Sequence, residues 1–264
     1  MKNKDKIISK HSLKFDSNFE CGNLHSAVKI SNNEYHLFIH PDTNTGGHTQ
    51  WFYYKVSGME KGVEYTFKIM NFNKKHSAFQ KGMSPWVFSL KTWENLGHGW
   101  DVTETYNVDY CWNPFNKAVN LIMKKKHEDK FSKIYKEGNK SKKSKSIQNL
   151  KANKLYALRF DYKWKYSEDE VYFAFSIPYS YSQCLTFIGN VVEKMPAVVN
   201  KEIVYSNKEL WKTLGGRRVN IIKITNKNQE NSEGKQSIVI MARCHPGETV
   251  GSFVMEGVLK YLLK

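Results

Sequence analysis

Short segments rich in aromatic and β-branched residues fill the first two thirds of the chain and limit the folds it can adopt. Such side chains suit a pleated, half-buried surface, and several segments alternate apolar with polar residues as strands do. Turn-forming residues such as Asp42-Thr43-Asn44 separate them. With no long amphipathic helix in this region, the pattern predicts an antiparallel β-sandwich. The expected strands are residues 35–39, 51–56, 64–72, 118–123, 154–160 and 171–177.

The pattern changes near residue 180, which we take as the boundary between a sandwich domain, residues 1–180, and a second domain, residues 181–264. In the second domain, residues 237–242 are apolar from Ile238 onward, which predicts a strand buried on both faces as in a parallel sheet. Strands that alternate with helices are typical of an α/β domain. The other expected elements are helices at 182–195 and from Val250, with Thr249 as N-cap, a turn at 214–216 and a strand at 219–225.

The net charge of +16 is concentrated in one stretch of the chain. Residues 117–154 contain 13 Lys and only three acidic residues, in a composition rich in Lys, Ser and Asn that is typical of a solvated insertion. The alternative is an arm that binds a polyanion. A nucleic-acid module interleaves Arg with aromatic residues, and Arg is scarce here, so nucleic acid is disfavoured as a partner.

Cysteine usage and hydropathy bear on the compartment. Cys21, Cys111, Cys184 and Cys244 lie far apart and form no Cys-x-x-Cys pair, so neither a disulfide framework nor a cysteine zinc site is indicated. The N-terminus carries no apolar run of signal-peptide length, and no stretch approaches the length of a membrane span. We therefore expect a reduced, cytoplasmic protein without a membrane partner.

The tetrapeptide His245-Pro246-Gly247-Glu248 lies between the expected strand and helix of the second domain. Imidazole nitrogen and carboxylate oxygen are both zinc ligands, and two of them three residues apart on one turn can converge on one ion. Loops that follow strands are also where α/β folds place their ligands. A bare His-x-x-Glu is a weak signal, however. A Glu that caps the helix beside a surface His is the alternative reading.

Two further groups are candidates for a functional role. His40, Asp42 and His48 form the nearest rival metal cluster, although a loop closed by side-chain hydrogen bonds explains them better. Arg243 precedes the His-x-x-Glu motif and either orients an acidic substrate or forms a structural salt bridge with Glu248, of which the salt bridge is favoured.

Residues 241–249, Met-Ala-Arg-Cys-His-Pro-Gly-Glu-Thr, resemble the first metal-binding motif of the cytosolic carboxypeptidases, a branch of the zinc metallocarboxypeptidases. Further motifs in the same order are similar to this family, whose fold is an N-terminal β-sandwich followed by an α/β carboxypeptidase domain. These motifs are Phe-Glu-Cys-Gly-Asn-Leu at 19–24, Asp-Thr-Asn-Thr at 42–45 with residues 48–53, Tyr-Phe-Ala at 172–174, Pro-Tyr-Ser-Tyr at 178–181 and Leu-Gly-Gly at 214–216.

The resemblance implies that His245 and Glu248 are two ligands of a catalytic Zn²⁺. Such a zinc takes three protein ligands and leaves one position open for water. In this family the third ligand, the residue that binds the substrate carboxylate and the general-base Glu come well after the motif, and none can be assigned before Lys264. We therefore expect no catalytic residue in this chain. An inactive fragment, a truncated gene or a degenerate copy is expected.

The function that the resemblance implies is zinc-dependent removal of C-terminal amino acids, typically glutamates, from acidic protein tails such as those of tubulin. A basic chain suits such a partner, because opposite charge raises the rate of encounter. A non-catalytic protein that binds acidic polymers or tubulin tails through the sandwich and the Lys-rich segment is the alternative.

Overall fold

The computed structural model describes residues 12–43, 45, 48–115, 119, 154–194, 201–206, 212–213, 216–226, 234 and 236–262. The strand expected at 118–123 and the Lys-rich segment 117–154 therefore lie outside the described residues, apart from Val119 and Lys154. The chain forms two compact units. The first comprises Met1–Ser17, Asn23–Asp42 and Gly47–Ala174, and the second comprises Asn18–Gly22, Thr43–Gly46 and Phe175–Lys264.

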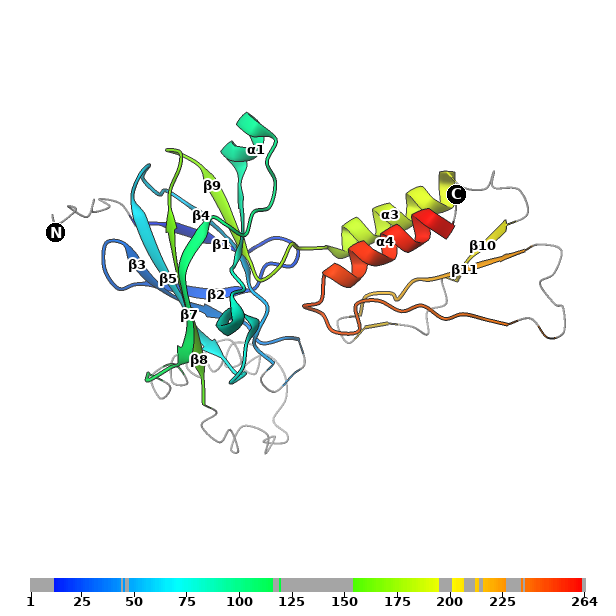
Figure 1. The fold of residues 1–264 in the computed structure, drawn as a ribbon, viewed down its shortest axis with the longest axis horizontal. Helices are drawn as coiled ribbons and strands as arrows, with labels where there is room; N and C mark the ends of the chain where they lie inside the picture. The colour runs from blue at the N-terminus through cyan, green and yellow to red at the C-terminus, as the bar shows by residue number, and fades with distance from the viewer. Residues whose placement is uncertain are drawn as a thin grey trace, which may run out of the picture. The chain divides into compact units, whose positions relative to one another are not determined.

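Two sheets form the first unit, and most of their strands are labelled in Figure 1. All neighbours pair antiparallel except β3 and β5, which are parallel because the chain crosses to the other sheet between them. The five-stranded sheet has the order β2 (Leu24–Lys29), β3 (Glu34–Ile39), β5 (Glu64–Phe72), β8 (Tyr156–Lys163), β7 (Thr105–Trp112). The four-stranded sheet has the order β1 (Lys14–Asp16), β4 (Tyr53–Ser57), β9 (Glu170–Ala174), β6 (Trp86–Ser89).

Aromatic rings from both sheets fill the space between them. Phe173 of β9 is fully buried, and its ring centroid lies 5.2 to 5.6 Å from four other rings. Tilted and edge-on contacts of this kind add to the free energy gained by burying the rings from water. The four rings belong to Tyr54 of β4, Phe67 of β5, and Phe160 and Tyr162 of β8.

The sandwich predicted from the alternating aromatic segments is confirmed. Strand β5 has the bounds that the sequence predicted, and β3, β4, β8 and β9 differ from prediction only at their ends. The sequence did not reveal β1, β2, β6 and β7, nor the short helices η1 (Ala78–Lys81) and α1 (Leu90–Leu96).

The second unit contains two helices and a two-stranded sheet. The predicted helices are confirmed as α3 (Tyr181–Lys194) and α4 (Val250–Leu262). They lie side by side in Figure 1, and Lys260 Nζ of α4 is 5.3 Å from the ring of Phe187 in α3. Strands β10 (Lys201–Ser206) and β11 (Ile221–Asn226) pair antiparallel. No helix in the part of the chain that the structure describes could cross a bilayer.

The prediction of a strand at residues 237–242 is wrong. These residues form no strand, and Ile238, Val239 and Met241 are 88%, 82% and 77% exposed. An apolar run becomes a buried strand only where other strands pair with it and helices cover it. No paired strand accompanies it among the described residues, so the run is extended and open to water.

The core contacts of Phe173 give a test of the sandwich. We expect Phe173→Ala to lower the free energy of unfolding by about 3–5 kcal/mol, because it removes a ring that both sheets contact. Chemical denaturation followed by tryptophan fluorescence measures this change. The matched control is Phe115→Ala, whose ring is 60% exposed and should cost little. Equal losses for both variants would show that Phe173 is not the centre of the core.

Candidate metal site

His245 and Glu248 lie on a turn immediately before helix α4. The Glu248 amide donates to the His245 carbonyl at 3.1 Å, which closes the turn. Within it, His245 Nδ1 and Glu248 Oε1 are 3.0 Å apart, and the two side chains are 77% and 64% exposed. The sequence thus folds locally so that an imidazole nitrogen and a carboxylate oxygen converge at the protein surface.

This pair of donor atoms fits two positions of a zinc site. Ligands about 2.0–2.1 Å from a tetrahedral zinc are about 3.3 Å from each other, close to the observed separation. Nitrogen and carboxylate oxygen are also the donor types that zinc prefers. Among the described residues, no group of three or more His, Cys, Asp or Glu could hold a metal. The turn therefore brings together two side chains of ligand type, and both are exposed.

Arg243 holds the turn in shape from its start. Its Nε donates to the Pro246 carbonyl at 2.9 Å, and its Nη1 donates to the Tyr179 carbonyl at 3.0 Å and to Ser252 Oγ at 3.2 Å. Its backbone has φ of 62°, a left-handed conformation that is uncommon for a residue other than glycine. The salt bridge to Glu248 favoured from sequence is wrong, because Glu248 pairs with His245 and the guanidinium is occupied by carbonyl and hydroxyl oxygens. Burial lowers the pKa of Arg243.

Tyr179 connects the segment before α3 to helix α4. Its hydroxyl donates to Glu256 Oε1 at 2.8 Å, and its ring packs edge-on against Phe253 at 5.0 Å. Burial, together with the bond to Glu256, raises the pKa of the phenol, so it remains protonated. Because the Tyr179 carbonyl also accepts from Arg243, one residue connects the turn and the helix.

Two further polar contacts position the segments around the turn. Thr249, which is buried, shares a hydrogen bond of 2.8 Å with Ser176 Oγ. Glu20 accepts from the Ser182 amide at 2.9 Å, at the start of α3, where a carboxylate also interacts favourably with the helix dipole. Burial raises the pKa of Glu20, but hydrogen bonds from Ser182, Ser180 and Tyr181 outweigh it, and the net pKa is lowered.

The rival cluster forms no metal site. The Asp42 amide donates to the His48 carbonyl at 2.8 Å, so a backbone hydrogen bond joins the two residues rather than the side-chain bonds expected from the sequence. The ring of His40 lies 4.8 Å from that of His25, edge to face. Burial raises the pKa of Asp42 from its ordinary value. Among the described residues, His40, Asp42 and His48 do not form a group that could hold a metal ion.

Sequence reasoning identified His245 and Glu248 but assigned no role to Tyr179 or Glu20. Both residues lie in motifs that resemble the family, yet their function is to accept or donate hydrogen bonds that involve backbone groups distant in sequence. A hydrogen bond to a backbone carbonyl or amide leaves no trace in residue type. The structure was therefore needed to find them.

Comparison with known proteins relates two regions of the chain to carboxypeptidases. Residues 15–113 match the family described as "Cytosolic carboxypeptidase N-terminal domain", and residues 197–264 match that described as "Zinc carboxypeptidase". A metallo-carboxypeptidase from Burkholderia cenocepacia superposes with a TM-score of 0.57 at 19% identity, covering 96% of this chain and 49% of the other. The fold is that of the metallocarboxypeptidases, and zinc is the cofactor that this class implies.

Curated relatives narrow the class to one family. The chain is 32% identical to cytosolic carboxypeptidase 1 of Gallus gallus over 95% of its own length and 19% of the relative. It is 32% identical to cytosolic carboxypeptidase 2 of Danio rerio, over 96% of its own length and 30% of the relative. The chain belongs to the cytosolic carboxypeptidase family. It spans about a fifth to a third of the length of these relatives.

The position of Arg243 leads to a test of the turn. We expect Arg243→Lys to loosen residues 244–249, because an ammonium cannot reach the Pro246 and Tyr179 carbonyls at once as the guanidinium does. Hydrogen exchange of peptides from this turn should become faster, and the free energy of unfolding should fall by about 1–3 kcal/mol. The control is Arg217→Lys, an exposed residue that should change neither. Unchanged exchange in Arg243→Lys would contradict the role described here.

Glu20 gives a prediction for pH dependence. Its folded-state pKa lies below the ordinary value of 4.5, so its stabilising contribution is present above that pH and is lost as the pH falls through the folded value. We expect Glu20→Gln to lower the melting temperature at neutral pH, and the difference from wild type to vanish in acid. Calorimetry over a pH series measures it. A difference that persisted below the folded pKa would show that the carboxylate charge is not responsible.

Proposed function

We propose that this chain contributes two zinc ligands, His245 and Glu248, to a metallocarboxypeptidase that removes C-terminal residues from acidic protein tails. The supporting observation is the convergence of His245 Nδ1 and Glu248 Oε1 on a turn before α4, 3.0 Å apart. Membership of the cytosolic carboxypeptidase family supports glutamates as the residues removed, tubulin tails as substrates and the cytoplasm as the compartment.

In this proposal zinc, when bound, polarises the scissile carbonyl and lowers the pKa of a bound water. The chain's own residues supply the frame. His245 and Glu248 hold the ion, while Arg243 and Tyr179 keep the turn in place through backbone carbonyl contacts. Arg243 was also a candidate for substrate binding. Its three donated hydrogen bonds support positioning of the turn as its main role.

The two-donor turn also limits what this stretch does by itself. A catalytic zinc of this type takes three protein ligands, and the described residues offer a group of two at this place. The general base and the carboxylate-binding residue of the family are likewise not assigned in the chain. We propose that residues 1–264 bind zinc weakly and do not turn over substrate.

The second candidate is a non-catalytic protein that binds acidic tails. The observation in its favour is the same lack of a third donor among the described residues, combined with a net charge of +16. The two candidates differ in the role of the turn. A chain that binds acidic peptides but no zinc favours the second candidate, whereas metal binding that depends on both residues favours the first.

Zinc titration tests the first candidate. We expect the 264-residue chain to bind one Zn²⁺ and His245→Ala or Glu248→Ala to weaken binding at least tenfold, because each variant removes one of two protein ligands. Isothermal titration calorimetry measures the affinity. His98→Ala, which alters an exposed His in the first unit, is the matched control and should bind as wild type. Equal affinity in all four proteins would rule out the turn as the site. Hydrolysis of a glutamate-tailed peptide by residues 1–264 would contradict the expectation that they are inactive.

A further inference from the structure

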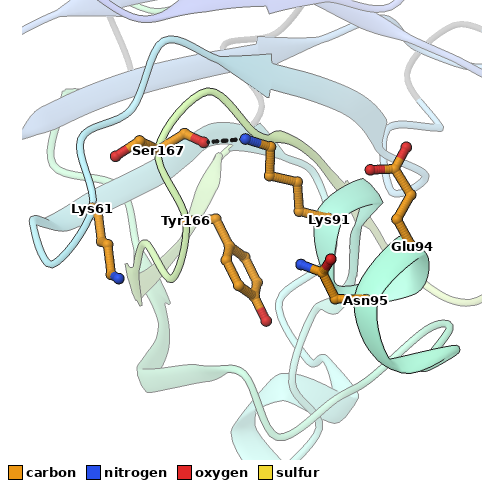
Figure 2. Close-up of a pocket in the computed structure, with 6 residues that line it drawn as sticks. All are labelled: Lys61, Lys91, Glu94, Asn95, Tyr166 and Ser167. Carbon is orange, nitrogen blue, oxygen red and sulfur yellow. Dashed lines mark hydrogen bonds between the residues drawn. The ribbon is translucent and has the colours of Figure 1, made fainter.

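Two adjoining hollows lie at one rim of the sandwich. The first has a volume of about 440 Å³ and is drawn in Figure 2. The second has a volume of about 520 Å³, and Lys61 lines both. Four segments form this rim: the turn between β4 and β5, the end of β8 with the turn that follows it, helix α1, and the residues just before β7. All belong to the first unit, and no residue of the 243–249 turn takes part.

Hydrogen bonds hold three of these segments of the rim together. The Gly62 amide donates to the Trp164 carbonyl at 2.8 Å, which joins the two turns. Buried Asp169 accepts from Ser89 Oγ at 2.6 Å and from the Lys91 amide at 3.0 Å, which joins α1 to the β8–β9 turn. A surface that is already ordered loses less entropy when a ligand binds. The rim therefore presents its side chains from a fixed frame.

The charges that line the hollows are mostly positive. Four lysines face two glutamates there, Glu94 and Glu104. Glu104 is already paired with Lys165, so it does not neutralise another lysine. Lys91 Nζ donates to the Ser167 carbonyl at 2.7 Å and keeps its charge. The remaining two, Lys61 and Lys163, are exposed and form no ion pair with any described residue.

Polar and aromatic groups accompany the lysines. In Figure 2 the ring of half-buried Tyr166 lies between Lys61 and Asn95 of α1, with Lys91 above it. Asn95 is exposed, and its amide can both donate to and accept from a peptide backbone. The lysines, the Tyr166 ring and the Asn95 amide together suit an extended peptide: the lysines can bind its spaced carboxylates, and the amide can bind its backbone.

We propose that this rim is a docking surface for an extended acidic peptide, which it holds through Lys61 and Lys163. Given the proposed function, the peptide is a glutamate-rich segment of the substrate protein. A peptide is favoured over nucleic acid because Glu94 stands among the lysines and repels a continuous phosphate backbone, whereas spaced carboxylates can avoid it. The contacts are exposed, so the binding depends on salt.

Binding of a labelled oligoglutamate peptide to the full 264-residue chain tests the proposal, with fluorescence anisotropy as the readout. We expect the double variant Lys61→Glu/Lys163→Glu to raise Kd by about three- to tenfold at low salt, since two exposed charge contacts become repulsive. The control is Lys14→Glu/Lys29→Glu, which makes the same change in net charge at exposed positions of β1 and β2. Its Kd should stay near that of wild type. The lysines at 117–154 are present in both variants, so the difference between the variants isolates the rim.

Equal Kd values for the two double variants would overturn the proposal, because binding would then follow net charge alone. The assignment to acidic peptides would be overturned if a single-stranded RNA bound more tightly than the peptide and its binding depended on Lys61 to the same degree. The chain with both His245→Ala and Glu248→Ala should bind the peptide as wild type. Failure of the zinc site and failure of this rim are therefore observed in separate experiments.

Discussion

A single guanidinium sets the shape of the turn that carries His245 and Glu248, because Arg243 donates to the Pro246 carbonyl within the turn and to the Tyr179 carbonyl outside it. Tyr179 in turn is fixed by its hydroxyl on Glu256 and its ring on Phe253, both in α4. The two metal donors are exposed and have little packing of their own. Their relative position therefore depends on the contacts between the two residues and on the neighbours that hold the backbone of the turn.

This division of roles explains how an exposed pair of donors can be ordered. Side chains at the surface lose rotamer freedom only when something holds the backbone beneath them. Here the backbone is held by a left-handed residue at 243 and by Thr249, whose hydroxyl bonds to Ser176. Metal sites depend in general on such supporting contacts, whose loss weakens metal affinity although no ligand is changed.

The sequence predicted those features that depend on local pattern. Strand β5 and helices α3 and α4 were found because their apolar residues recur with the period of one element over nine or more residues. Strand β2 was missed because Leu24–Lys29 mixes polar residues into both faces. Strand β7, Thr105–Trp112, was missed although its polar and apolar residues alternate; only two of its residues are buried, and its register shifts between Tyr106 and Asp109. The parallel pairing of β3 with β5 is a property of the topology that no short pattern encodes.

The same reasoning explains the outcome at the candidate site. Residue type and spacing predicted that His245 and Glu248 come close together, which the structure shows, and their role as metal ligands stays a prediction. The hydrogen-bond partners of Arg243 could not be predicted from the sequence. Two of them are the backbone carbonyls of residues 179 and 246, and carbonyls are present at every position. Residues 237–242 show the opposite error. Their composition indicated burial, but burial depends on strands and helices elsewhere, which a segment cannot specify.

The exposed run at residues 238–241 has a consequence for the purified chain. Four consecutive large apolar residues that pair with no strand among the described residues are a template on which another extended segment can form a strand. The surplus of positive charge opposes association at long range, but salt screens that repulsion within about 10 Å. In buffers of ordinary ionic strength, these four side chains then decide whether the chain aggregates. A soluble protein fused near them, rather than at the N-terminus, would shield them and keep the chain monomeric.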